Sequence, residues 1–368
     1  MSVFSAPQKP GNPAQNDPDA ILDLLNSRAA GNETRYEAAA LKVAEGARRG
    51  LPLQMFIIAL SSRNGDRLPP GAAVDAETQE AYFKASRPVL ERIAARKSNP
   101  IVLYLLAMES HDAAMLEKAA ELGNPQALNR TAAGLVADNP ARYPDSVTNA
   151  ALVKAFGRFK AAAKQNDMNG CYNFGVCLNS GIGTERDEEA AFNAFRTAAE
   201  RGHVDAMNNL GICFREGIHV RPDIEASAYW FRKASEAGSP TGMLNYGWAL
   251  KNGEGVPQNR KKAQYLIYKA AKAGHPDALN AWGLMLLRGD CVGKEPVAAF
   301  KAFEAAALLG NATAMDNLYA CYRDGIGVEK SASKALYWKM KSDAANGDAV
   351  AAAWVKDEEK KLAKEKKE

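Results

Sequence analysis

The sequence predicts an all-α fold, a solenoid of helix-turn-helix repeats that are each 36 residues long. Rows of glycine that return at this spacing carry the prediction. The first two rows are Gly202, Gly238, Gly274 and Gly310, and Gly175, Gly211, Gly247 and Gly283. The third row runs through five units without a break: Gly181, Gly217, Gly253, Gly289 and Gly325. A fixed period of this length is typical of solenoids, whose stacked units bury a shared core.

Apolar and small residues keep the same period. Two columns are large and apolar: Phe159, Phe195, Phe231, Ile267 and Phe303, and Phe174, Leu210, Tyr246, Trp282 and Leu318. Two columns are small: Ala162, Ala198, Ala234, Ala270 and Ala306, and Gly170, Ala206, Gly242, Ala278 and Ala314. Small side chains let neighbouring helices approach closely, and large side chains fill the space between them.

Each unit then divides into two helices. One helix is predicted from about Ala190 to Arg201 and ends at Gly202, which suits a left-handed cap. The next helix is predicted from about Asp205 to Glu216, before Gly217. Abundant alanine and few β-branched residues favour helix along the whole chain.

The chain is expected to contain four segments. Residues 1–18, which four prolines interrupt, are predicted to be a disordered arm. Residues 19–149 are expected to be an irregular helical region with degenerate repeats, which includes seven extra residues in the Pro140–Val147 loop. Residues 150–355 hold five clear units and one partial unit. Residues 356–368 form a charged tail, either a solvated helix end or disordered.

Composition narrows the possible partners and compartment. The net charge is +4, from 47 basic and 43 acidic residues without a clustered basic stripe, which argues against nucleic-acid binding. The longest apolar runs, Leu53–Leu60 and Ile101–Met108, are too short for membrane insertion. The first residues do not resemble a secretory signal, and the five cysteines do not recur in pairs. We therefore expect a cytoplasmic protein, with signal-independent export as the open alternative.

Three stretches carry a family resemblance. Ala206–Gly217 and Gly242–Pro257 resemble the first helix of a Sel-one-like repeat (SLR), and Ala263–Gly274 resembles its second helix. The family is similar to tetratricopeptide repeats. The resemblance implies an α/α superhelical solenoid with a concave groove and a role as an adaptor in protein complexes. Some secreted, cysteine-rich members carry a β-lactamase label, but this sequence lacks their paired cysteines.

No catalytic, metal-binding or cofactor-binding residues are predicted. His203 and His275 share a turn position with Ser239, Asn311 and Asp348, so we interpret them as structural. Ser331 and Lys334 have the Ser-x-x-Lys form of penicillin-recognising enzymes. Ser331, however, lies in a column of helix N-cap residues, which is otherwise Asp187, Asp223, Asn259 and Glu295.

Cysteines and glycine pairs also have structural interpretations. Cys177, Cys213 and Cys321 share one column that suits a small buried helix residue. The Gly-x-Gly pairs that begin at Gly181, Gly253 and Gly325 recur in register as turns between helices.

The candidate binding surface comes from the resemblance, because the helix that contains Leu-Gly lines the concave face of related tetratricopeptide arrays. Three ladders of variable residues would then face the groove: Tyr172, Asn208, Leu244, Asn280 and Asp316; Val176, Ile212, Trp248, Leu284 and Ala320; and Asn179, Arg215, Lys251, Leu287 and Arg323. The protein-binding candidates are Asn208, Arg215, Trp248, Lys251, Asn280 and Arg323. A solvated helix face is the alternative.

A further ladder consists of Asn173, Asn209, Asn245 and Asn317. Asparagine is a mediocre helix former, so we expect these side chains to bond to the backbone of the neighbouring unit.

These observations predict a non-enzymatic scaffold or adaptor that binds other proteins or peptides and needs no cofactor. Its oligomeric state stays open. Two alternatives remain, a weak hydrolase of the β-lactamase-like type and an exported effector built on the same repeats.

Overall fold

The structure is a computed structural model that describes residues 33–63, 68–69, 71–97, 99–141, 144–290 and 292–365. The predicted arm at residues 1–18 and the last three residues of the tail lie outside these ranges. All regular secondary structure in the described residues is helical, which confirms the predicted all-α fold.

The helices fall into an irregular set and a regular set. The irregular set is α2 (Glu33–Arg48), α3 (Pro52–Arg63), α4 (Ala76–Lys97), α5 (Pro100–Ser110), α6 (Ala113–Glu121), α7 (Pro125–Asp138) and the 3₁₀ turn η2 (Asp145–Val147). The regular set begins with α8 (Ala150–Lys164), α9 (Met168–Ser180), α10 (Glu188–Glu200), α11 (Val204–Glu216), α12 (Ile224–Glu236) and α13 (Pro240–Asn252). It continues with α14 (Arg260–Lys272), α15 (Pro276–Arg288), α16 (Pro296–Leu308), α17 (Ala312–Asp324), α18 (Ala332–Ala345) and α19 (Ala349–Glu365).

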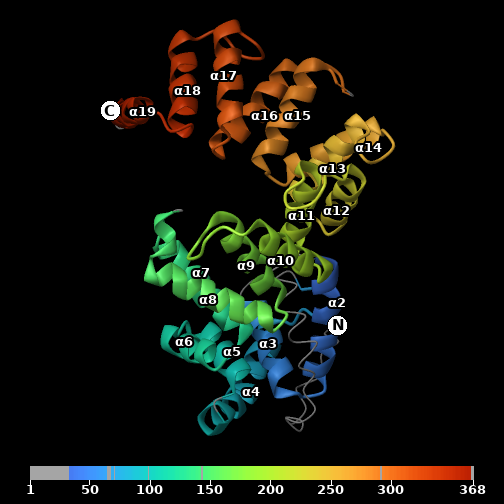
Figure 1. The fold of residues 1–368 in the computed structure, drawn as a ribbon, viewed down its shortest axis with the longest axis vertical. Coiled ribbons are helices and arrows are strands. Elements are labelled where there is room, and N and C mark those ends of the chain that lie inside the picture. Colours follow the sequence, from blue (N-terminus) through green and yellow to red (C-terminus); the bar gives the residue numbers. More distant parts are fainter. Residues whose placement is uncertain are drawn as a thin grey trace. The chain divides into compact units, whose positions relative to one another are not determined.

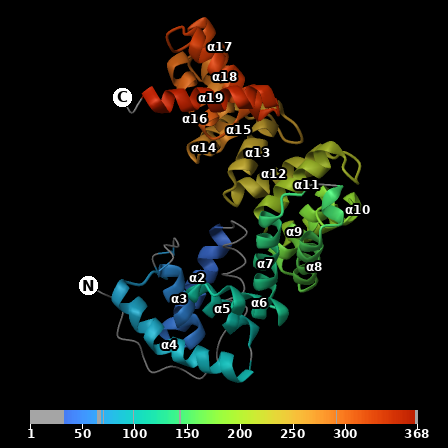
Figure 2. The same ribbon diagram turned by 90° about the vertical axis from the view of Figure 1, so that its left-hand side faces the viewer.

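The chain divides into two compact units, the first ending at Asp223 and the second beginning at Ile224. Within each unit, most helices pack against the helix that precedes them and the helix that follows them in the sequence (Figures 1 and 2). This stacking of helix pairs is the solenoid that the 36-residue period predicts.

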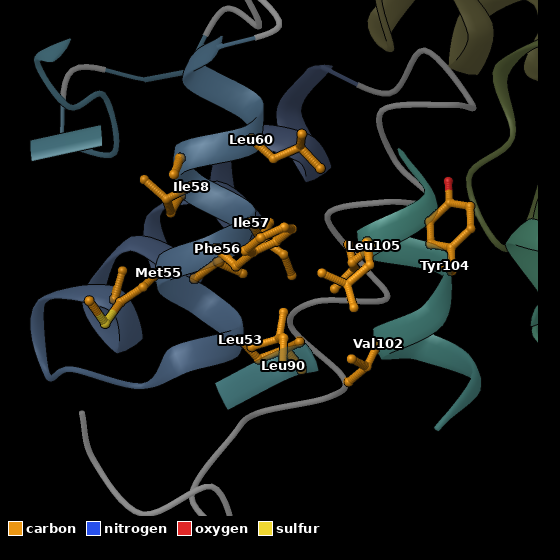
Figure 3. Close-up of a cluster of buried hydrophobic side chains, with 14 of the residues drawn as sticks. Leu53, Met55, Phe56, Ile57, Ile58, Leu60, Leu90, Val102, Tyr104 and Leu105 are labelled. Carbon is orange, nitrogen blue, oxygen red and sulfur yellow. The ribbon is translucent and has the colours of Figure 1, made fainter. Parts of the chain in front are cut away.

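The core of the first helices is built from large side chains. Ten of the twelve residues of α3 are buried, so this helix is surrounded rather than amphipathic. Phe56 packs edge-on against Phe83 of α4, with the ring centres 5.3 Å apart. Figure 3 shows side chains of α3, α4 and α5 meeting in this cluster, among them Ile57, Leu90 and Leu105.

The regular repeats use smaller residues to bring helices together. Gly283 of α15 lies against Phe303 of α16, and a Cβ atom at this position would lie 2.6 Å from the ring carbon Cε1. This separation is far below van der Waals contact, so any larger residue would displace the ring. The second glycine row therefore marks places where one helix backbone touches a large side chain of the next helix.

Helix boundaries agree with the sequence to within two residues. The predicted pair, from Ala190 and from Asp205, corresponds to α10 and α11. The seven extra residues that we expected in the Pro140–Val147 loop are divided differently. Four lengthen the connection between α7 and α8, which spans 139–149, and the other three lengthen these two helices. Helix α19 continues to Glu365, so the described part of the charged tail is helical.

Candidate protein-binding surface

Trp248 and Lys251 form an aromatic and basic pair on α13. They lie three residues apart, on the same face of the helix. The Lys251 ammonium lies 4.9 Å from the centre of the Trp248 ring, within range of a cation–π interaction. The same ammonium forms an ion pair with the carboxylate of Asp290, which follows α15. The structure therefore brings two of the predicted residues together and compensates the lysine charge within the chain.

Arg215 and Arg323 lie in the last turns of α11 and α17. Arg215 forms an ion pair with Glu216 at 3.1 Å, and Arg323 forms one with Asp324 at 2.6 Å. The guanidinium of Arg323 also lies 5.2 Å from the centre of the Tyr319 ring. Both arginines are exposed, and a cation at a helix C-terminus is favoured by the helix dipole.

Asn208 and Asn280 are much less accessible than the sequence suggested. Their exposed fractions are 7% and 9%. The side-chain oxygen of Asn280 accepts a hydrogen bond of 2.7 Å from the amide of Asn317. These two positions therefore offer little surface to a partner, and Asn280 serves the packing of successive repeats.

Two members of the asparagine ladder, Asn173 and Asn317, link helices through side chains rather than through the expected backbone groups. Asn317 of α17 bonds to Asn280 of α15. Asn173 of α9 makes the corresponding bond of 2.8 Å to Asn129 of α7. Each bond therefore joins two helices that are separated by one helix in the sequence.

The candidate residues are distributed over both compact units. Asn208 and Arg215 belong to the first unit, and Trp248, Lys251, Asn280 and Arg323 belong to the second. The second unit thus contains the Trp248–Lys251 pair and the basic side chain of Arg323.

Histidines at the turn position are helix N-caps. Nδ1 of His203 accepts the backbone N–H of Ala206 at 3.3 Å, and His275 does the same for Ala278. Nε2 of His275 lies 3.0 Å from the Thr241 hydroxyl. Burial lowers the pKa of His203 to about 4, so this ring is neutral at physiological pH. The structural interpretation of this column is confirmed.

Asp167 occupies the same capping position at the start of α9. Its carboxylate accepts the backbone N–H of Gly170 at 2.7 Å. Burial raises its pKa to about 6, although hydrogen bonds from Gly170 and Asn169 act in the opposite direction. One carboxylate oxygen, Oδ2, is buried without a hydrogen-bond partner. This cap therefore carries a desolvation cost that the neutral caps avoid.

Ser331 is also a cap. Its hydroxyl accepts the backbone N–H of Lys334 at 3.3 Å. The Lys334 ammonium lies instead 5.5 Å from the centre of the Tyr322 ring. The Ser-x-x-Lys pattern thus begins a helix, as the repeat register predicts.

The cysteines of the shared column are buried thiols. Burial raises the pKa of Cys177 to about 12 and the pKa of Cys213 and of Cys321 to about 11. These groups therefore stay protonated at neutral pH, and a thiol is a poor nucleophile.

The described residues contain no group of three or more histidine, cysteine, aspartate or glutamate side chains placed to hold a metal ion. No helix among them has the length and apolar content needed to cross a bilayer.

Sequence reasoning missed a hollow of about 330 Å³ on α14 and α15, lined by Lys261, Gln264, Tyr265, Tyr268 and Trp282. Trp282 belongs to a column that we interpreted as packing. The sequence feature that could have revealed the hollow is the pair Tyr265 and Tyr268. These tyrosines lie three residues apart on α14 and outside its packing columns.

Comparisons with known proteins agree with this architecture. The model of the Sel1 repeat matches residues 113–124, 169–203, 204–239, 240–275, 276–311 and 314–338. No curated protein matches the sequence.

Two solved structures are similar in fold. A Sel1 repeat protein from Oxalobacter formigenes is 21% identical with a TM-score of 0.55, over 69% of this chain and 95% of that chain. A protective antigen of uropathogenic Escherichia coli strains, which displays an SLR fold, is 23% identical with a TM-score of 0.50. That alignment covers 86% of this chain and 66% of that chain.

The first matched segment, 113–124, lies in α6 and the turn that follows it, inside the region that we expected to hold degenerate repeats. The later segments follow one another from α9 to α18. Together with the stacked helix pairs, these matches show that the chain belongs to the Sel1-repeat (SLR) family.

Proposed function

We propose that this chain is a non-enzymatic scaffold that binds a partner protein through the ladder face of its Leu-Gly helices. The observation that carries the proposal is the contrast between uniform packing columns and variable ladder positions. At one ladder position the repeats carry Val176, Ile212, Trp248, Leu284 and Ala320. A surface that differs from repeat to repeat suits the recognition of one partner along its length.

The Trp248–Lys251 pair is the proposed anchor of this surface. Tryptophan is among the residues most frequent at the energetic centres of protein interfaces. The ion pair with Asp290 holds the lysine over the indole ring, so the group is already ordered before a partner arrives. Arg215 and Arg323 extend the basic character of the ladder within their own units.

The hydrolase alternative has no comparable support. Its nucleophile would be Ser331, whose hydroxyl caps α18, and its lysine ammonium lies over the Tyr322 ring. We therefore place the function in binding rather than in catalysis.

Capture of partners from a cell extract tests the proposal. The tagged full-length chain and a Trp248→Ala, Lys251→Ala variant are compared by mass spectrometry of the proteins that co-purify. We expect the variant to lose the main partner. The binding of that purified partner should then weaken at least about tenfold, because truncation of a central anchor removes much of the interface energy.

A matched control separates binding from folding. The Leu309→Ala variant removes an exposed apolar side chain from the end of α16 and should bind as the wild type does. Equal recovery of the same partners by the wild type and by the Trp248→Ala, Lys251→Ala variant would exclude the ladder face as the binding site.

A further inference from the structure

A second surface lies on the opposite side of α15 from the ladder. Trp282, in the floor of the hollow, precedes the ladder residue Leu284 by two positions. Two residues correspond to about 200° of rotation around an α-helix, so the two side chains leave α15 in nearly opposite directions. The hollow is therefore separate from the Trp248–Lys251 face.

Three of the five residues that line the hollow are aromatic. Tyr265 and Tyr268 are 61% and 45% exposed, which is unusual for large side chains on a helix that also packs two neighbours. The rings of Tyr268 and Trp282 lie 5.0 Å apart, tilted by 54°. These rings form a preformed apolar surface that a partner side chain can cover.

Helix α14 carries an uncompensated positive charge beside this floor. It contains five basic residues and no acidic residue: Arg260, Lys261, Lys262, Lys269 and Lys272. All five are exposed, and within the part of the chain that the structure describes none of them forms an ion pair. Three of the five lie in the first turn, where the helix dipole disfavours cations. Among the described residues, only Lys262 of these five lies over an aromatic ring, 5.5 Å from the centre of Tyr246.

The combination of uncovered aromatic rings and uncompensated basic residues on α14 does not recur in the neighbouring repeats. In the next repeat, the positions of Tyr265, Tyr268 and Trp282 are occupied by Lys301, Glu304 and Leu318. In the previous repeat the exposed Tyr229 ring is covered by its own cations, because Arg232 and Lys233 lie 5.6 and 5.7 Å from its centre. Among the described residues, no cation lies in this way over the rings of Tyr265, Tyr268 or Trp282.

We propose that the hollow on α14 and α15 binds an acidic segment of a partner protein. An apolar or aromatic side chain of the segment would rest on Tyr265, Tyr268 and Trp282, while its carboxylates face Lys261 and the other cations of α14. A hollow of about 330 Å³ accommodates one such side chain. The proposal rests on the protein-binding role above and adds a second surface with its own specificity.

The charge distribution favours a protein segment over nucleic acid. The uncompensated cations are confined to one helix of 13 residues. Helices α12 and α16 on either side each contain as many acidic as basic residues. A phosphate backbone is held by a basic stripe that continues along the surface, whereas a short acidic segment needs only one basic helix.

Fluorescence anisotropy with defined probes tests the proposal on the full chain. The main probe is a labelled peptide of about a dozen aspartate and glutamate residues with one central phenylalanine. Companion probes replace that phenylalanine by alanine, or all acids by their amides, and a labelled oligothymidylate of similar length represents nucleic acid. The variant is Tyr265→Ala, Tyr268→Ala, which removes exposed rings, and its fold is checked by circular dichroism. The matched control is Tyr229→Ala on α12.

We expect the main probe to bind at least about tenfold more tightly than either companion peptide. The Tyr265→Ala, Tyr268→Ala variant should lose at least about tenfold in affinity, while Tyr229→Ala keeps the wild-type value. No binding of the main probe, or equal binding by the folded variant, would overturn the proposal. Tighter binding of the oligothymidylate, lost in the same variant, would replace it with a nucleic-acid site. None of these outcomes bears on the Trp248–Lys251 face, which is tested by its own variant.

Discussion

The first helices and the regular repeats solve the same packing problem with different residues. Around α3 and α5, large aliphatic and aromatic side chains fill one shared cluster that includes Phe56, Ile58 and Leu105 (Figure 3). In the repeats, alanine and glycine columns bring neighbouring helices into close contact, as at Gly283 and Phe303. The first arrangement depends on a few large residues, and the second on many small contacts between successive helices.

This difference has a consequence for function. Helix α3 has few outward positions to vary, because it is buried almost completely. The repeat helices keep several ladder side chains exposed, among them Arg215 and Arg323, although Asn208 and Asn280 are buried. We therefore expect the first helices to support the solenoid and the repeats to carry the binding surfaces.

The largest effect is expected when an aromatic ring is removed from the buried cluster around α3. Phe56 is fully buried, so Phe56→Ala should lower the free energy of unfolding by about 3–5 kcal/mol. Chemical denaturation measures this loss of stability, and hydrogen exchange shows which helices are affected. The control, Leu122→Ala, removes a side chain that is 44% exposed. If Phe56→Ala also removed exchange protection from α13–α16, the repeats would depend on the distant cluster, and their stabilisation by local contacts would be contradicted.

A smaller effect is expected in a repeat turn. Gly255 has a φ of +68°, and an added Cβ atom would lie 2.1 Å from the carbonyl oxygen of Ile224. Gly255→Ala should therefore destabilise by about 2 kcal/mol, from the left-handed backbone and the displaced neighbour. Thermal unfolding of the variant beside Gly293→Ala measures it, since nothing lies within 4 Å of a Cβ atom at Gly293. Equal stability of the two variants would show that the turn is not constrained.

A buried cap should make stability depend on pH. Burial raises the pKa of Asp167 from 3.8 to about 6, so the folded state binds its proton more tightly than the unfolded state. The protonated Asp167 carboxyl therefore contributes its full stabilisation below pH 3.8. This contribution is lost as the pH rises through 6. Asp167→Asn, which cannot titrate, should gain roughly 2 kcal/mol of stability over the wild type between pH 4 and pH 7.5.

Denaturation of both proteins across that range checks this expectation. Asparagine already caps α17 at Asn311, so the substitution preserves the cap. A difference between the two proteins that stays constant with pH would argue that the Asp167 carboxyl titrates normally.

The smallest expected effect is a gain. His219 occupies the position equivalent to Gly255 and has a φ of +64° without being glycine. His219→Gly should stabilise the first unit by about 1 kcal/mol, because the left-handed conformation costs L-residues energy that glycine does not incur. Denaturation measures the gain, and Arg221→Gly serves as a control for the added flexibility. A loss of stability would imply that the contact of His219 with Phe192, 5.8 Å between ring centres, outweighs the strain.

The sequence could predict the repeats well because their columns reflect local contacts. The glycine rows, the two N-cap columns that contain His203 and Ser331, and the buried cysteines all follow from one register. The cluster around α3 could not be predicted in detail, because its contacts join helices that share no period. The accessibility of Asn208 and Asn280 was also misjudged, since their burial depends on the neighbouring repeat. The hollow at Trp282 went unnoticed for the opposite reason, because a residue in a packing column is left partly uncovered.

Hydrogen exchange of the full chain with and without its captured partner shows which helices form the binding surface. We expect the partner to slow exchange in the repeat helices, with the strongest protection on α13 and α15, and to leave exchange in α2–α5 unchanged. A footprint confined to α2–α5, with exchange of α13 and α15 unaltered, would contradict it.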